Sequence, residues 1–265
     1  MKKWFLLKEN KPGKGSYNMA VDDFLFESLG KDPVTYIRFY TWKRPTVSIG
    51  CSQDIRKVLD LGFCKKNRID IVRRITGGKL VLHHKEVTYS VCSSDVNVFT
   101  SSLSSSYKKI SEALIKGLKK LNIPAYLSSD DNLFYSRSSL PCFSYPARNE
   151  IKVKDKKIVG SAQKRAAHRF IQHGSIPLEN DDRLLQSVSL LDKKNEEIRL
   201  ITASQAAQRK IDFCLLAENL ILGIREFFDV ELHPMEFSKK QKEIIRSIQK
   251  SRHENTDWIY DKKMN

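Results

Sequence analysis

The sequence predicts an α+β fold with largely antiparallel sheets and flanking helices. Segments rich in β-branched and aromatic residues outnumber helical segments in the first two thirds of the chain. They adjoin tight turns, which join antiparallel strands, rather than long crossover helices. After about residue 181 the apolar spacing becomes helical. We therefore expect a mixed domain over residues 1–180 and a helical C-terminal extension over residues 181–265.

In the first half of the chain, the spacing of apolar residues and the positions of turn residues predict one helix and several strands. Residues 16–26 carry apolar side chains at the spacing of one helix face, with Ser16 as a candidate N-cap. Arg44 and Pro45 separate the first two strands that follow this helix. Expected strands cover residues 4–7, 34–40, 46–49, 69–74, 80–82 and 87–92.

The second half begins with a serine-rich stretch at 101–106 that leads into a helix ending near Asn122. Residues 150–154 and 157–162 flank Asp155 and Lys156, as expected for an antiparallel hairpin. A further strand is expected before Pro177, at 169–176. Helical spacing then covers residues 183–190, 204–228 and 237–250.

Composition excludes several classes of protein. The 265 residues include 40% hydrophobic and 29% charged side chains, interleaved along the chain, which is typical of a folded globular protein. The basic start has an apolar run of only four residues, and no segment approaches the ~18 apolar residues of a membrane helix. The five cysteines form no CxxC pair, so we expect reduced thiols and a cytoplasmic location, with no membrane partner.

The formal charge of +16 indicates an acidic partner. Nucleic-acid-binding proteins usually gather lysine and arginine on a recognisable motif, whereas here they are spread along the chain. Acidic proteins and anionic ligands fit the charge equally well. Nucleic acid is therefore not the favoured partner.

The first candidate binding segment is a turn in which Arg73 and Arg74 end a strand and Thr76, Gly77 and Gly78 follow. Glycine lets the backbone approach a ligand without a Cβ in the way. The alternative is an ordinary hairpin turn with solvated arginines. The Walker spacing of a phosphate-binding loop is absent.

The histidines at His83, His84 and His173 suggest pocket walls rather than a metal site. Adjacent residues of a strand point to opposite faces, and no spacing here supports metal ligation. One of the first two can therefore face a ligand.

Cys142 lies in a loop segment rich in serine, proline and aromatic residues, before a basic hairpin. Loops often carry nucleophiles, and nearby ammonium groups favour the reactive thiolate. The alternative is an inert, buried cysteine.

Five segments in order resemble the lipoate ligase and octanoyltransferase family, of which biotin ligases are distant relatives. The similarity covers residues 16–180. It depends on residues 18–22, 38–50 with Gln53, 73–78 continuing to His83, 157–163 and 172–176.

The resemblance implies a biotin/lipoate protein ligase-like catalytic domain and a pocket for an acyl group. Its substrate-binding residues would be Arg73, Arg74, Thr76, Gly77, Gly78, His83, Gly160, Ser161, Ala162 and His173. By the same resemblance Cys142 would be the nucleophile, and Lys157 would lower the pKa of its thiol and stabilise the oxyanion.

Details favour an octanoyltransferase over a ligase. The run at 86–91 is similar to the transferase version, and Cys142 falls where the cysteine-dependent transferases keep their nucleophile. The implied partners are acidic acyl carrier protein carrying octanoyl-pantetheine, and lipoyl domains or the glycine-cleavage carrier protein. The transferase needs no cofactor.

Other interpretations stay open. The segment at 148–150 is closer to ligases, which would use ATP and magnesium, and Lys79 departs from the usual residue after the glycine pair. An amidotransferase moving octanoyl between lipoyl proteins is a second alternative. A non-catalytic nucleic-acid or carrier-binding protein that kept the fold is a third.

Overall fold

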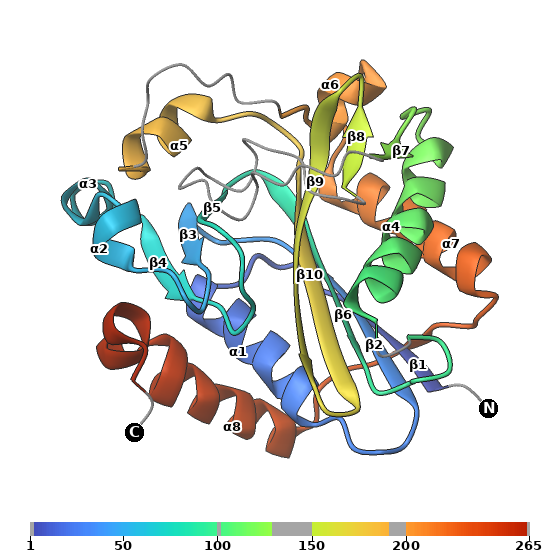
Figure 1. Ribbon diagram of the computed structural model, residues 1–265, viewed down its shortest axis with the longest axis horizontal. Coiled ribbons are helices and arrows are strands. Elements are labelled where there is room, and N and C mark those ends of the chain that lie inside the picture. The colour runs from blue at the N-terminus through green and yellow to red at the C-terminus, as the bar shows by residue number, and fades with distance from the viewer. Residues whose placement is uncertain (1–2, 100–101, 129–149, 191–199, 264–265) are drawn as a thin grey trace.

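The computed structural model describes residues 3–99, 102–128, 150–190 and 200–263. Its strands are β1 (Lys3–Lys8), β2 (Val34–Tyr40), β3 (Thr46–Ile49), β4 (Asp70–Arg73), β5 (Val81–His83), β6 (Glu86–Ser93), β7 (Tyr126–Leu127), β8 (Ile151–Val153), β9 (Lys156–Ala166), β10 (Arg169–Pro177) and β11 (His233–Pro234). Its helices are α1 (Gly15–Glu27), α2 (Ile55–Val58), α3 (Leu61–Lys66), α4 (Leu103–Lys120), α5 (Asp182–Val188), α6 (Ala203–Ala207), α7 (Phe213–Phe228) and α8 (Lys239–Ile248), followed by π-helical turns η1 (Gln249–His253) and η2 (Asp257–Asp261) (Figure 1).

The strands form two sheets. The larger has the order β11-β1-β2-β6-β10-β9-β8-β7, and the smaller has the order β4-β3-β5. From β2 to β7 every neighbouring pair in the large sheet is antiparallel, whereas β1 is parallel to both its neighbours. The α+β prediction with largely antiparallel sheets is therefore confirmed.

Strand alternation gives the large sheet two different faces. In β6, Val87, Tyr89 and Val91 join the core beneath α4 and α7. Thr88 lies between them in sequence and lines a pocket on the opposite side, together with Met19 of α1. One strand thus supplies both a hydrophobic core and a polar wall.

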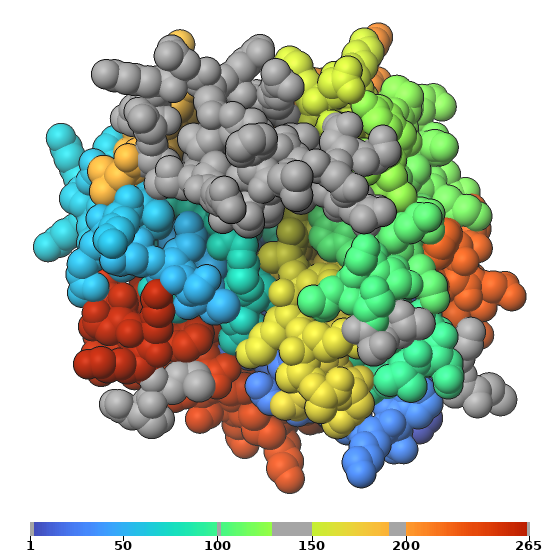
Figure 2. Space-filling model, in the orientation of Figure 1, coloured from blue at the N-terminus to red at the C-terminus, as the bar shows by residue number. Residues whose placement is uncertain are grey.

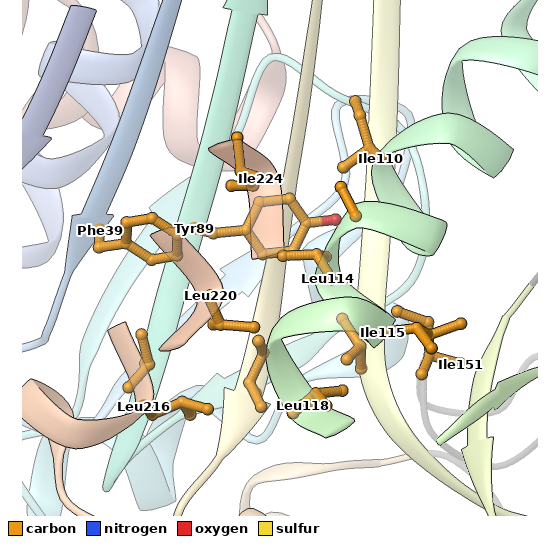
Figure 3. Packing of buried hydrophobic residues seen from close by; sticks show 14 of the residues in the cluster. Phe39, Tyr89, Ile110, Leu114, Ile115, Leu118, Ile151, Leu216, Leu220 and Ile224 are labelled. Atoms are coloured by element: carbon orange, nitrogen blue, oxygen red, sulfur yellow. The ribbon is translucent and has the colours of Figure 1, made fainter. Parts of the chain in front are cut away.

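Helices α4 and α7 cover the first face. Figure 3 shows Leu114 of α4 beside the ring of Tyr89, with Leu118 of α4 and Leu220 of α7 in the same cluster. A Cβ at Gly223 would lie only 2.3 Å from the backbone nitrogen of Gly117, so glycine at this crossing lets the helices touch. Each buried leucine contributes about 1.5–3 kcal/mol of transfer free energy. This crossing ties the C-terminal helices to the large sheet.

Helix α1 lies on the other face, beside the small sheet and α8 (Figure 1). It begins at Gly15 after Lys14, without a side-chain cap, so the predicted N-cap at Ser16 is wrong. The Ser16 hydroxyl instead donates to Glu254. A Cβ at Gly15 would lie 2.7 Å from Thr46, so packing against the small sheet sets where the helix starts.

The remaining predictions of elements hold with small shifts. Two residues with positive φ, Lys154 and Asp155, make the turn between β8 and β9, one residue earlier than predicted. The helical stretch expected at 204–228 is interrupted, with α6 ending at a left-handed Gln208. Among the described residues, none of the helices is both long and apolar enough to cross a membrane.

The end of the described chain packs on the α1 side of the molecule. Figure 2 shows the C-terminal residues, in red, against the light-blue surface around residues 50–60. Arg56 pairs with Asp261 at 3.0 Å, and Lys262 donates to the carbonyl of Ser52 at 2.6 Å. The C-terminal turns therefore support the loop that follows β3.

Candidate active-site pocket

A pocket opens where α1, the small sheet and the α1-facing side of the large sheet meet. It has an empty volume of about 370 Å³, part of which is open to solvent. Its walls are more apolar than polar. The lining residues are Met19, Tyr40, Trp42, Ser48, Arg74, Val81, His83, Thr88, Gly160, Ser161, Ala162, His173, Gly174 and Ser175.

Arg74 shapes the turn beside the pocket. Its guanidinium donates to the carbonyl oxygens of Ser48 at 3.0 Å, Gly77 at 3.0 Å and Lys79 at 2.6 Å. Gly78 has a φ of +91°, a conformation that glycine adopts without strain. Arg74 therefore folds the chain at 77–79 into a compact turn.

The turn that contains Gly77 and Gly78 approaches another part of the protein backbone closely, at Gly50. A Cβ at Gly50 would lie 2.1 Å from the carbonyl oxygen of Gly78. Gly77 and Gly78 are not among the pocket-lining residues. The turn stands beside the pocket and is held against the end of β3.

Arg73 contacts a different part of the protein from Arg74. It is fully buried, is absent from the pocket lining, and donates to the carbonyls of Gly50, Gln53 and Ile259 at 2.7–3.0 Å. It also donates to the carbonyl of Trp258. Arg73 is the last residue of β4 and Arg74 follows it, and their side chains point to opposite sides, one to the C-terminal segment and the other to the pocket turn.

His83 and His84 point to different sides, as predicted, although β5 ends at His83 and His84 lies in the turn after it. His83 lines the pocket, whereas His84 binds Asp181 at 2.9 Å beside a second hollow. The His83 ring stacks on Trp42 with centroids 4.0 Å apart. Its Nδ1 lies 2.7 Å from Glu86 and its Nε2 lies 2.7 Å from the Ser48 hydroxyl.

His173 is held by a second carboxylate. Its Nδ1 lies 3.1 Å from Asp22, and its Nε2 lies 2.7 Å from the Thr76 hydroxyl. Asp22 also accepts from Arg38 at 2.8 Å and from Tyr40 at 3.0 Å. Burial raises the pKa of Asp22, but the His173 hydrogen bond and the Arg38 charge lower it more, so its pKa lies below the ordinary value.

Strand β9 contributes Gly160, Ser161 and Ala162 to the pocket wall. The Ser161 hydroxyl lies 2.7 Å from that of Tyr89, whose pKa burial raises to about 12. A Cβ at Gly174 on the neighbouring strand would lie 2.5 Å from the Tyr89 ring. Glycine there brings β9, β10 and the Tyr89 ring together.

Of the two expected catalytic residues, the structure describes only Lys157. Lys157 is 2% exposed, and its Nζ lies 2.5 Å from Glu150. It lies on β9, three residues before Gly160, but is not among the lining residues. Cys142 lies outside the described residues.

The sequence analysis assigned no role to several residues in or next to the pocket, although most of them lie within the segments that resemble the family. Asp22 and Glu86 are the acids that bind the pocket histidines, and Ser48 joins His83 to Arg74. The available signal was an acid inside an otherwise apolar segment, since buried carboxylates need partners. In the described part of the chain, no group of three histidine, cysteine or acidic side chains is placed to hold a metal ion.

Comparisons with known proteins agree on a family. The model of the lipoyl protein ligase A/B catalytic domain matches residues 14–208. Octanoyltransferase LipM of Clostridioides difficile is 34% identical over 262 residues, covering 94% of this chain and 95% of the relative. Octanoyltransferase LipM of Bacillus anthracis is 36% identical over 264 residues, covering 93% and 94%.

Solved structures share the fold. Protein Ta0514 of T. acidophilum with bound lipoic acid has a TM-score of 0.83 at 22% identity, covering 98% of this chain and 100% of that one. A lipoate-protein ligase A bound with ATP also has a TM-score of 0.83 at 22% identity, covering 98% and 99%. These similarities support the fold that the sequence predicts.

Proposed function

Because this chain belongs to the family of lipoyl protein ligase A/B catalytic domains, we propose that it transfers octanoyl from a carrier-protein thioester to a lysine of a lipoyl domain. The observation that carries this choice is its 34–36% identity to octanoyltransferases over almost their full length. The pocket beside Arg74 would hold the acyl chain. Its walls are more apolar than polar, as a site for an alkyl chain requires.

The reaction proceeds in two steps. In the first, the Cys142 thiolate attacks the thioester carbonyl, the carbon–sulfur bond to pantetheine breaks, and the pantetheine thiolate leaves with a proton. In the second, a neutral lysine amine attacks the acyl-enzyme carbonyl, the carbon–sulfur bond to Cys142 breaks, and the proton lost by the nitrogen passes to the departing cysteine thiolate. A thioester becomes an amide, so the second step is downhill and needs no ATP.

Lys157 supplies positive charge near the acyl carbonyl. It sits on β9 close to Gly160 and Ser161, which line the pocket. An ammonium group there would lower the pKa of the Cys142 thiol and stabilise the oxyanion of each tetrahedral intermediate. Glu150 holds the Lys157 side chain in place from the neighbouring segment.

The basic surface would attract both protein substrates. A charge of +16 speeds encounter with acidic partners, and the effect weakens as salt screens it. The acyl carrier protein is the proposed donor, a lipoyl domain or glycine-cleavage carrier the acceptor, and the cytoplasm the location.

The test is the intact mass of the purified protein after incubation with octanoyl-carrier protein in the absence of ATP. We expect an octanoyl adduct on the native protein and on Cys214→Ala, which removes an exposed thiol. Cys142→Ala should show no adduct. Modification of lipoyl domain only when free lipoate and ATP are supplied would instead make the protein a ligase.

A further inference from the structure

The second step of the proposed reaction needs a group that accepts a proton from the incoming lysine. Lysine is an ammonium ion at neutral pH and cannot attack until it loses a proton. Among the described lining residues, His83 and His173 are the two histidines, the residue type that most often serves as a general base. The two histidines differ in how they are held.

Glu86 fixes the tautomer of His83. Its carboxylate is 3% exposed and accepts hydrogen bonds from Trp42 at 3.1 Å, from Thr88 at 2.5 Å and from Ser175. A carboxylate only accepts, so the His83 Nδ1 that lies 2.7 Å away carries the hydrogen. The His83 Nε2 therefore presents a lone pair.

Ser48 connects that lone pair to the pocket. Its hydroxyl lies 2.7 Å from His83 Nε2, to which it donates, and it accepts from Arg74 at 2.9 Å. A hydroxyl oxygen has two lone pairs, so one more donor can bind it. Ser48 and His83 both line the pocket.

We propose that the Ser48–His83–Glu86 chain accepts the proton of the acceptor lysine, with Ser48 and His83 acting on the proton and Glu86 as the positioning residue. The proposal rests on the proposed function. One ammonium N–H bond breaks as that proton passes to Ser48 Oγ, and the serine's own proton moves to His83 Nε2. The product is a neutral amine and an imidazolium beside the Glu86 carboxylate.

The surroundings of His83 suit a positive charge. In the described part of the chain, His83 is the one basic side chain paired with Glu86. Its ring also lies parallel to that of Trp42, whose face attracts cations. Arg74 opposes the charge from the Ser48 side, and Glu86 offsets it. Tyr40 and His173 are the other titratable groups in the lining.

His173 is less suited to this task. Its carboxylate, Asp22, already pairs with the Arg38 guanidinium at 2.8 Å and accepts from Tyr40. Less of that negative charge is left for an imidazolium. Its Nε2 binds Thr76, which is not among the lining residues. The His173 chain therefore ends away from the pocket space.

The test separates the two steps of the reaction. Octanoyl-enzyme is first formed and isolated, and its transfer to lipoyl domain is then followed by rapid quench and mass measurement from pH 6 to 9. We expect His83→Gln to slow transfer to lysine far more than it slows acyl-enzyme formation. Transfer to lysine should fall about 100-fold or more at pH 7, as for loss of a general base.

The pH profile gives a readout that a structural role would not change. Transfer by His83→Gln should rise about tenfold per pH unit, because the free fraction of neutral lysine then limits the rate. Native enzyme should show a flatter profile. Glu86→Gln should likewise lower the transfer rate more than the rate of acyl-enzyme formation.

His84→Gln is the matched control, since this neighbouring histidine also binds a carboxylate but lies outside the pocket. It should behave as native. His83→Ala gives a second measurement: added imidazole should restore transfer about tenfold or more, without changing acylation. Native-like transfer in His83→Gln, or equal loss of both steps without imidazole rescue, would overturn the proposal. Absence of any acyl-enzyme on the native protein would instead contradict the proposed function.

Discussion

Trp258 and Arg73 bind each other through both side chain and backbone. The indole Nε1 of Trp258 donates to the Arg73 carbonyl oxygen at 3.1 Å, and the Arg73 Nε donates to the Trp258 carbonyl at 3.0 Å. Arg73 also binds the carbonyls of Gly50 and Gln53. The contact therefore joins the C-terminal turn η2 to the loop that follows β3.

We predict that Trp258→Phe loosens this C-terminal segment. The change leaves the buried Arg73 carbonyl without its indole donor, which costs about 1–3 kcal/mol. Urea unfolding should show the loss, and limited proteolysis should release residues after 250 sooner than in native protein. Tyr260→Phe is the matched aromatic control and should leave both measurements unchanged, since the same ring remains in place.

A second prediction concerns the turn beside the pocket. Gly50→Ala would place a Cβ 2.1 Å from the Gly78 carbonyl oxygen, so the turn must move. We expect a loss of about 1–3 kcal/mol in stability, as for overpacking, and at least a tenfold fall in octanoyl transfer. Gly30→Ala serves as control, because nothing lies within 4 Å of a Cβ there. Equal activity of the two variants would contradict the prediction.

Asp22 should make stability depend on acid pH. Its pKa in the fold lies below 3.8, because His173 and Arg38 outweigh the effect of burial. The contribution of its charge is complete above the unfolded pKa and is lost as pH falls through the folded pKa. Asp22→Asn should therefore lose about 3–5 kcal/mol at pH 7.

Urea unfolding of native protein and Asp22→Asn across pH measures this contribution. The difference in unfolding free energy should stay constant from about pH 8 to pH 5 and shrink below pH 3.8, where Asp22 begins to take up a proton when unfolded. A difference that grows as pH falls would show that the carboxylate is not the stabilising form.

The buried thiols should resist alkylation. Burial, with the nearby Asp60 charge, raises the pKa of Cys64 to about 11, and burial raises that of Cys92 well above its ordinary value. At pH 8 the Cys64 thiolate is then about one part in a thousand. Iodoacetamide followed by peptide mass mapping should modify exposed Cys214 before Cys64 and Cys92. In urea all should react, and equal rates in the folded protein would contradict the prediction.

Local sequence was sufficient to predict those strands and helices whose residue types strongly favour one secondary structure. The strands predicted at 34–40 and 46–49 have the bounds of β2 and β3, since β-branched and aromatic side chains fit a pleated sheet. The helix expected to end near Asn122 ends at Lys120, and its apolar positions are buried in the core. The expectation that one of His83 and His84 faces the pocket also holds, although β5 ends at His83.

Long-range contacts decided the rest of the site. Arg73 and Arg74 are identical in type and adjacent, yet one holds the C-terminal turn and the other the pocket turn. Serine is a residue type that often caps helices, but the helix begins at Gly15, one residue before Ser16, where Gly15 packs against Thr46. Neither outcome can be read from neighbours in sequence.

The sequence by itself determined the family, the α+β class and six of the fourteen residues that line the pocket in the described part of the chain. Only the tertiary structure joined Glu86 to His83 and Asp22 to His173, and placed Lys157 against Glu150. The physical reason is that local propensity depends on nearby residues. The partner of a buried charge depends instead on which segment the fold brings within hydrogen-bond distance.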